Sequence, residues 1–90
     1  MAKVVAYCEV DDVDLWLKSA RRAEVLTPLG ITGRLFADPA GSNRVAIHGD
    51  VPDMDALQTF MRSSTAAEAM RADGVHIESL VLLVEAADHL

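Results

Sequence analysis

The sequence predicts a ferredoxin-like α+β domain whose strands and helices follow one another in the order βαββαβ. Three observations lead to this prediction. Strand-forming runs stand at both ends of the chain and on either side of a central turn, two segments with helical spacing lie between them, and 90 residues suffice for one domain. The usual solution for this order is a four-stranded antiparallel sheet with two helices on one face. We therefore treat residues 1–90 as a single domain.

The first strand and the first helix are predicted from the N-terminal third of the chain. Residues 4–10 are rich in strand formers, and Asp11 or Asp12 then supplies an N-cap for a helix. The helix ends before Pro28, which cannot continue it, and Gly30, which offers a left-handed exit. The apolar residues that recur at helical spacing in this segment are Val13, Trp16, Leu17, Ala20, Ala23 and Leu26.

Two further strands are predicted at residues 31–37 and 44–51. The segment 38–43 between them reads Asp-Pro-Ala-Gly-Ser-Asn, which is typical of a hairpin turn. In the second of these strands, alternation predicts one face with Val45, Ile47 and Val51 and another with Arg44, Ala46 and His48.

The second helix is predicted to open at Pro52-Asp53 and to carry the apolar residues Met54, Leu57, Phe60 and Met61. Thr65 and Glu68 match a capping box, which predicts a further helical piece to about Ala72. The last strand is expected at residues 76–85. Because its centre, residues 80–84, is apolar without alternation, we expect both of its faces to be covered.

The sheet face away from the helices has a mixed composition. It would carry Val5, Tyr7, Phe36 and Ala46 among Arg34 and His48. Hydrophobic residues make up 51% of the chain and its mean hydropathy is +0.20, which is more apolar material than so small a domain readily buries. These features predict that a second copy packs against this face. The alternative is an alanine-rich, well-packed monomer.

Charge and cysteine content limit the classes of partner. The net charge is -6 with only eight Lys and Arg residues, which disfavours nucleic acid and an anionic membrane surface. The single cysteine, Cys8, excludes an intrachain disulfide. The start of the chain does not resemble a signal peptide, and the longest apolar run, residues 80–84, is too short to span a bilayer. We therefore expect a cytoplasmic protein.

Several short segments carry a resemblance to a known superfamily. They are Asp12-Val13-Asp14-Leu15-Trp16, Gly30-Ile31-Thr32-Gly33-Arg34, Val51-Pro52-Asp53 with Leu57 and Phe60, Ser63-Ser64 ahead of Met70, and Gly74-Val75. Over nearly its whole length the chain resembles the dimeric α/β-barrel superfamily, which includes the antibiotic-biosynthesis monooxygenase-like proteins. Because these residues are caps, turns and core positions, the resemblance speaks for fold more than for chemistry.

The resemblance implies a homodimer in which two sheets face each other as a barrel, with a ligand cavity beside each sheet. Members of the superfamily include cofactor-free oxygenases, isomerases of small ring compounds, haem-degrading enzymes and proteins with no assigned activity. A histidine late in the first strand of similar relatives is replaced here by Cys8, so a role built on it is not expected. Residues 53–72 lack the axial histidine that haem requires, and we expect no cofactor.

One group of candidate site residues lies on the mixed sheet face. His48 has the chemistry of a general base, with Arg34 to hold a substrate anion and Tyr7 to orient it. The alternative is structural, in which His48 and Arg34 make interface hydrogen bonds or pair with Glu9 or Asp50.

A second group is apolar. Trp16, Phe60 and Met70 would line a pocket for an aromatic or polyketide-like ligand, or would simply be core. Cys8 is either a ligand contact or a buried, inert thiol.

No metal site is predicted. Capping accounts for the aspartates that follow the first strand, and the three histidines lack ligand spacing.

The function predicted from the sequence is a small homodimer that binds a small, partly apolar molecule, with any catalysis of the monooxygenase or isomerase type and without a metal or bound cofactor. The alternatives are a non-catalytic binding or accessory module and a structural dimer partner of the same fold.

Overall fold

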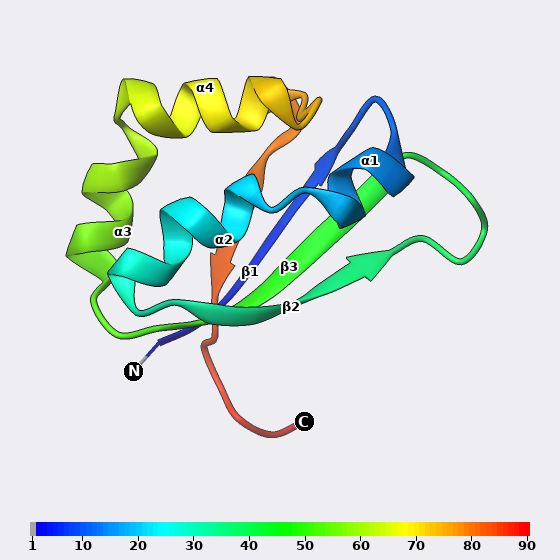
Figure 1. Ribbon diagram of the computed structural model, residues 1–90. Coiled ribbons are helices and arrows are strands. Elements are labelled where there is room, and N and C mark those ends of the chain that lie inside the picture. Colours follow the sequence, from blue (N-terminus) through cyan, green and yellow to red (C-terminus); the bar gives the residue numbers. More distant parts are fainter. Residues whose placement is uncertain (1) are drawn as a thin grey trace.

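The computed structural model describes residues 2–90 and contains a four-stranded antiparallel sheet with helices over one face (Figure 1). The strands are β1 (Ala2–Glu9), β2 (Thr32–Ala37), β3 (Arg44–Val51) and β4 (Val81–Val84), in the order β2-β3-β1-β4. The helices are α1 (Val13–Lys18), α2 (Arg21–Leu26), α3 (Met54–Met61) and α4 (Ser64–Ala72), with short 3-10 turns η1 (Thr27–Leu29) and η2 (Ile77–Ser79). The predicted ferredoxin-like fold is confirmed.

Strand alternation separates a helix-facing side of the sheet from an opposite side. The buried residues of β1 and β3 lie on the helix-facing side and form two core clusters, one completed by Trp16 of α1 and the other by Leu57 of α3. Val45, Ile47 and Val51 all belong to or pack against these clusters, as the alternation in β3 predicts.

The first helical segment is broken in two, so the prediction of one continuous helix is wrong. Asp12 caps α1 as expected, but α1 ends at Lys18 and Ser19 is extended, with ψ 127°. The Ser19 hydroxyl donates to Asp73 Oδ1 at 2.7 Å and accepts from the Arg21 amide at 3.2 Å. These contacts stabilise the break because they supply partners for groups that a helix would otherwise use.

The break also changes which residues of α2 face the sheet. Ala20 and Ala23 of the predicted apolar stripe are exposed. Arg22 and Val25 are half-buried and turn toward the sheet instead, beside Leu26, which faces the sheet as the predicted stripe requires.

The second helical segment begins as predicted but its second piece has a different cap. The Asp53 side chain accepts from the Ala56 amide at 3.1 Å and caps α3. Ser63, not Thr65, caps α4, since the Ser63 hydroxyl accepts from the Ala66 amide at 3.2 Å. The predicted capping box is therefore wrong by two residues, although α4 does end at Ala72.

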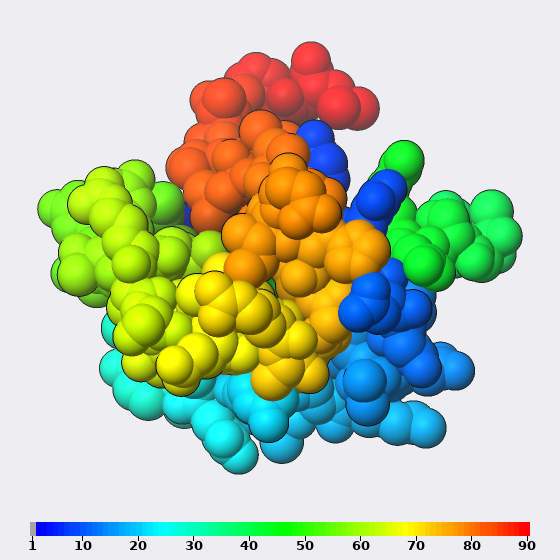
Figure 2. All heavy atoms as spheres, turned by 90° about the horizontal axis from the view of Figure 1, so that it is seen from above, coloured from blue at the N-terminus to red at the C-terminus, as the bar shows by residue number. Residues whose placement is uncertain are grey.

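The last strand is shorter than predicted and lies at an edge of the sheet. β4 spans four residues, and η2 occupies part of the expected strand. The residues of β4 are 36% to 54% exposed. We expected both faces of this strand to be covered, and one subunit alone does not cover them. Figure 2, viewed from above α4, shows the hairpin at 38–43 (green) projecting from the body.

No helix within residues 2–90 is long and apolar enough to cross a membrane.

Candidate functional site

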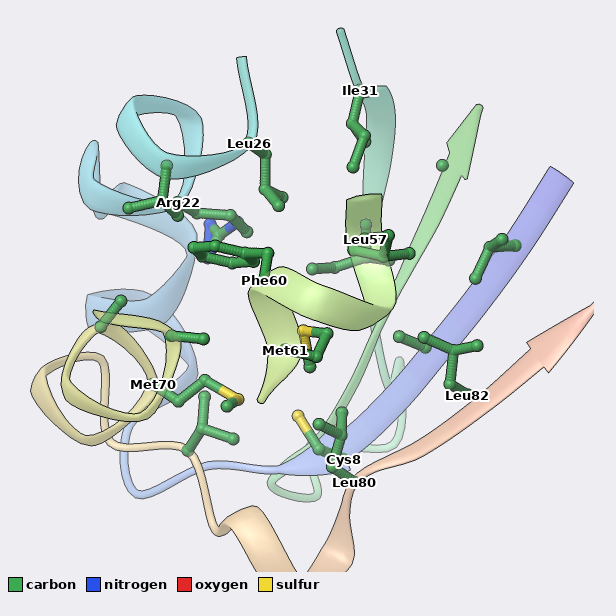
Figure 3. Close-up of a pocket in the computed structure, with 18 of the residues that line it drawn as sticks. Cys8, Arg22, Leu26, Ile31, Leu57, Phe60, Met61, Met70, Leu80 and Leu82 are labelled. Carbon is green, nitrogen blue, oxygen red and sulfur yellow. The ribbon is translucent and has the colours of Figure 1, made fainter. Parts of the chain in front are cut away.

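A cavity of about 140 Å³ lies between the helices and the sheet, partly open to solvent. β1 and β3 form its floor, and α2, α3 and α4 supply most of its walls (Figure 3). The lining is almost entirely apolar, and its charged side chains are Arg22 and Asp73.

Small residues create this space. Ala6 and Gly49 stand on the floor, and Ala66 and Ala69 of α4 line the wall. A Cβ added at Gly49 would meet its neighbours at ordinary contact distances of 3.5 Å and 3.6 Å, so the glycine is not required for close approach of the backbone. Because Gly49 has no side chain, it leaves space in the cavity floor that the larger residues around it do not fill.

Four of the sequence-predicted residues line the cavity, namely Cys8, Trp16, Phe60 and Met70. Trp16 is only 2% exposed, so it contributes both to the core and to the cavity wall. Burial raises the pKa of the Cys8 thiol, while the nearby positive charge of Arg22 acts in the opposite direction. Cys8 is therefore a protonated thiol at neutral pH. Ligand contact by these residues stays a prediction.

The other three predicted residues lie on the opposite side of the sheet, which we call the sheet face. His48 is directly across from Arg34 of β2, and Tyr7 is across from Ala46. None of Tyr7, Arg34 and His48 lines the cavity. The sequence-predicted residues thus form two groups on opposite sides of the sheet, because neighbouring residues of a strand point in opposite directions.

The sheet face is an apolar band with charged margins. Two cross-strand rows form the band, Val81–Tyr7–Ala46–Phe36 and Leu83–Val5–His48–Arg34. All five large apolar side chains in these rows are exposed. Lys3 and Asp50 in the next row form an ion pair at 3.9 Å. Within residues 2–90, no salt bridge joins His48 or Arg34 to a carboxylate, so the predicted pairing with Glu9 or Asp50 is absent from this subunit.

Arg22 and Asp73 are charged cavity residues that were not predicted from the sequence. The Arg22 guanidinium lies 4.3 Å from the centre of the Trp16 ring, and its Nη2 donates to the Trp16 carbonyl at 2.8 Å. Its Nη1 is buried without a hydrogen-bond partner, and Asp73 Oδ2 is 3.9 Å away. Burial lowers the pKa of Arg22, which Asp73 and Cys8 oppose, and arginine stays charged in proteins. The helical spacing of Arg22, Val25 and Leu26 was the sequence feature that could have predicted that Arg22 shares a helix face with these two apolar residues.

Asp73 holds this corner of the cavity together. The carboxylate is buried after the end of α4 and accepts hydrogen bonds from Ser19 at 2.7 Å and from Arg21 Nη1 at 3.2 Å. Its position links the break between α1 and α2 to α4. In the part of the chain that the structure describes, no three His, Cys, Asp or Glu side chains converge as metal ligands.

Comparison with solved structures defines the class of fold. The chain is similar to a crystal structure of an antibiotic biosynthesis monooxygenase, with a TM-score of 0.64 and 14% identity over 99% of this chain and 100% of that one. It is also similar to a candidate antibiotic biosynthesis monooxygenase from Deinococcus radiodurans, with a TM-score of 0.59 and 10% identity over 100% and 95% of the two chains. No family model and no curated protein sequence matches.

The chain thus has the ferredoxin-like fold of the antibiotic-biosynthesis monooxygenase-like proteins, as the sequence resemblance predicts. At these identities the similarity defines fold, and function must be argued from the site.

Proposed function

We propose that this chain forms a homodimer through the sheet face and binds a small, mostly apolar molecule in the helix–sheet cavity of each subunit. The observation that carries the binding function is the cavity itself. It has a largely apolar lining with a few polar groups gathered at one corner, which is the usual design of a small-molecule site.

The cavity volume supports a ligand the size of one ring. An engineered apolar cavity of about 150 Å³ in another protein binds benzene. The cavity here, of about 140 Å³, is of similar size. Met61 and Met70 in its wall are unbranched and flexible, so they can adjust to a substituent on that ring.

The titratable groups of the cavity favour binding over acid–base catalysis. Cys8 has a raised pKa, Arg22 is a permanent cation, and Asp73 is occupied by Ser19 and Arg21. The lining therefore offers no free carboxylate or imidazole to remove a proton. A cofactor-free monooxygenase or isomerase reaction is the second candidate, and the names of the structural neighbours suggest the monooxygenase type.

The exposed apolar band supports the homodimer. A band of this kind with charged margins has the anatomy of an interface core and rim. In the proposed dimer, His48 and Arg34 supply polar contacts between the two sheets. The general-base role of His48 is the alternative, and His48→Ala separates the two. Loss of dimerisation would support the interface role, whereas loss of turnover in an intact dimer would support catalysis.

The binding proposal is tested with 4-nitrotoluene as an apolar one-ring probe. Trp16 is the only tryptophan and lines the cavity, so binding should quench its fluorescence. Ala69→Leu fills the cavity and should abolish saturable quenching. Ala67→Leu is the matched control, because Ala67 lies on the same helix outside the lining. Absence of saturable quenching in the wild type, or equal quenching in both variants, would overturn the proposal.

A further inference from the structure

We propose that Arg22 binds a ring-attached oxygen anion of the ligand, so that the molecule recognised is a single ring bearing a phenolate or enolate oxygen. This inference rests on the proposed binding function and adds the chemical class of the ligand. It starts from the guanidinium at the cavity wall, which Figure 3 shows extending from α2 toward the other lining side chains.

Arg22 carries an unpaired hydrogen-bond donor. Arg22 Nη2 is bonded to the Trp16 carbonyl at 2.8 Å, but Nη1 is buried and has no hydrogen-bond partner. The Asp73 carboxylate at 3.9 Å is beyond hydrogen-bond distance. A buried donor without an acceptor costs free energy, and an oxygen of a bound molecule that displaces the groups covering Nη1 would remove that cost.

The corner of the cavity around Arg22 carries an excess of positive charge. Arg21 and Arg22 both form their ion pairs with the same carboxylate, that of Asp73. Two positive charges against one negative charge leave this corner of the cavity cationic. Cys8, which also lines the cavity, does not neutralise it because burial keeps its thiol protonated. An anionic oxygen is therefore favoured over a neutral substituent, and the interaction is strengthened by the apolar surroundings.

This corner differs in polarity from the rest of the cavity lining. Arg22 and Asp73 are the only charged residues in a lining that is otherwise almost wholly apolar. A ligand with several charges would leave most of them without partners. One ring with one oxygen anion satisfies both parts of the site.

The test compares 4-nitrophenol with 4-nitrotoluene, in which a methyl group replaces the hydroxyl. We expect the wild-type protein to bind the phenolate at least about ten-fold more tightly, as a hydrogen bond to a charged group should give. The phenolate, unlike the phenol, absorbs visible light. Its absorbance should therefore appear at lower pH when the probe is bound, because the cation favours the ionised form.

Arg22→Met should remove both the preference and the absorbance shift, so that the variant binds the two probes with affinities within about two-fold of each other. Arg21→Met is the matched control and should keep the preference, because Arg21 also pairs with Asp73 but does not line the cavity. Arg22→Lys, which retains charge without the planar fork, should give an intermediate preference and serves if the Met variant unfolds.

The outcomes separate the two proposals. Equal wild-type affinity for the two probes, or an unchanged preference in both Arg22 variants, would overturn the role of Arg22 and leave cavity binding in place. Failure of the wild type to bind either probe would overturn the binding function and this inference with it. Calorimetric titration measures both affinities without a fluorescent reporter.

Discussion

Phe36 tests the dimer because a large part of its side chain has no cover within one subunit. It lies on β2 in the apolar band and is 50% exposed. A large aromatic side chain buries roughly 200 Å² when fully covered. About 100 Å² therefore remains for a partner to cover, which is worth about 2.5 kcal/mol at roughly 25 cal/mol per Å².

A symmetric dimer contains two such side chains, so Phe36→Ala removes about 5 kcal/mol on this reckoning, or more than a thousand-fold in the dimer Kd. A binding free energy calculated from buried area is an upper bound, because association also costs side-chain ordering and the desolvation of polar groups. We therefore expect a weakening of at least about ten-fold. Analytical ultracentrifugation over a concentration series measures the Kd.

Leu15→Ala is the control for Phe36→Ala. Leu15 is 57% exposed, but it lies on α1 on the other side of the sheet. Its removal should leave the dimer Kd unchanged. A wild-type chain that sediments as a monomer throughout the concentration series, or equal weakening by both substitutions, would refute the reasoning.

Three further predictions concern single side chains. Ser63→Ala should destabilise the fold by about 1 kcal/mol in urea unfolding. Thr65→Ala should cost much less, and the reverse order would contradict the observed cap. The bond from His76 Nε2 to Asp11 raises the His76 pKa. The pair therefore stabilises the fold below the usual histidine pKa of about 6.5, and the effect is lost as pH rises through the raised value. The decrease in Tm caused by His76→Gln should therefore become smaller as pH rises. A decrease that does not depend on pH would contradict this role of the ion pair. Cys8 should react with a disulfide reagent far more slowly in the native protein than in urea, and similar rates would contradict its burial.

Features encoded by neighbouring residues were predictable. Alternation in residues 44–51 identifies both faces of β3, and Asp12 and Asp53 cap the helices that follow them. Gly30 ends its segment with φ 72°, as its left-handed freedom suggests. The apolar composition of the sheet face was also visible, because strand periodicity assigns each residue to a side.

The alternation also shows why the candidate site was only partly predictable. Cys8 and Tyr7 are adjacent in sequence, yet Cys8 lines the cavity and Tyr7 lies on the sheet face. The sequence prediction placed Tyr7 with His48 on the mixed sheet face and left Cys8 as either a ligand contact or a buried thiol. Trp16, Phe60 and Met70 were assigned to the helix-facing side, where the structure places them in the cavity wall.

The sequence by itself determined the order of elements, the two sides of the sheet and most of the caps, because each depends on residues two to four positions apart. Only the tertiary structure decided the helix break at Ser19 and the burial of Arg22. The bond from Ser19 to Asp73 spans 54 positions in the chain, and local periodicity cannot register such a contact. That contact shifts the phase of α2, turns Arg22 toward the sheet and places a cation in the wall of an apolar cavity.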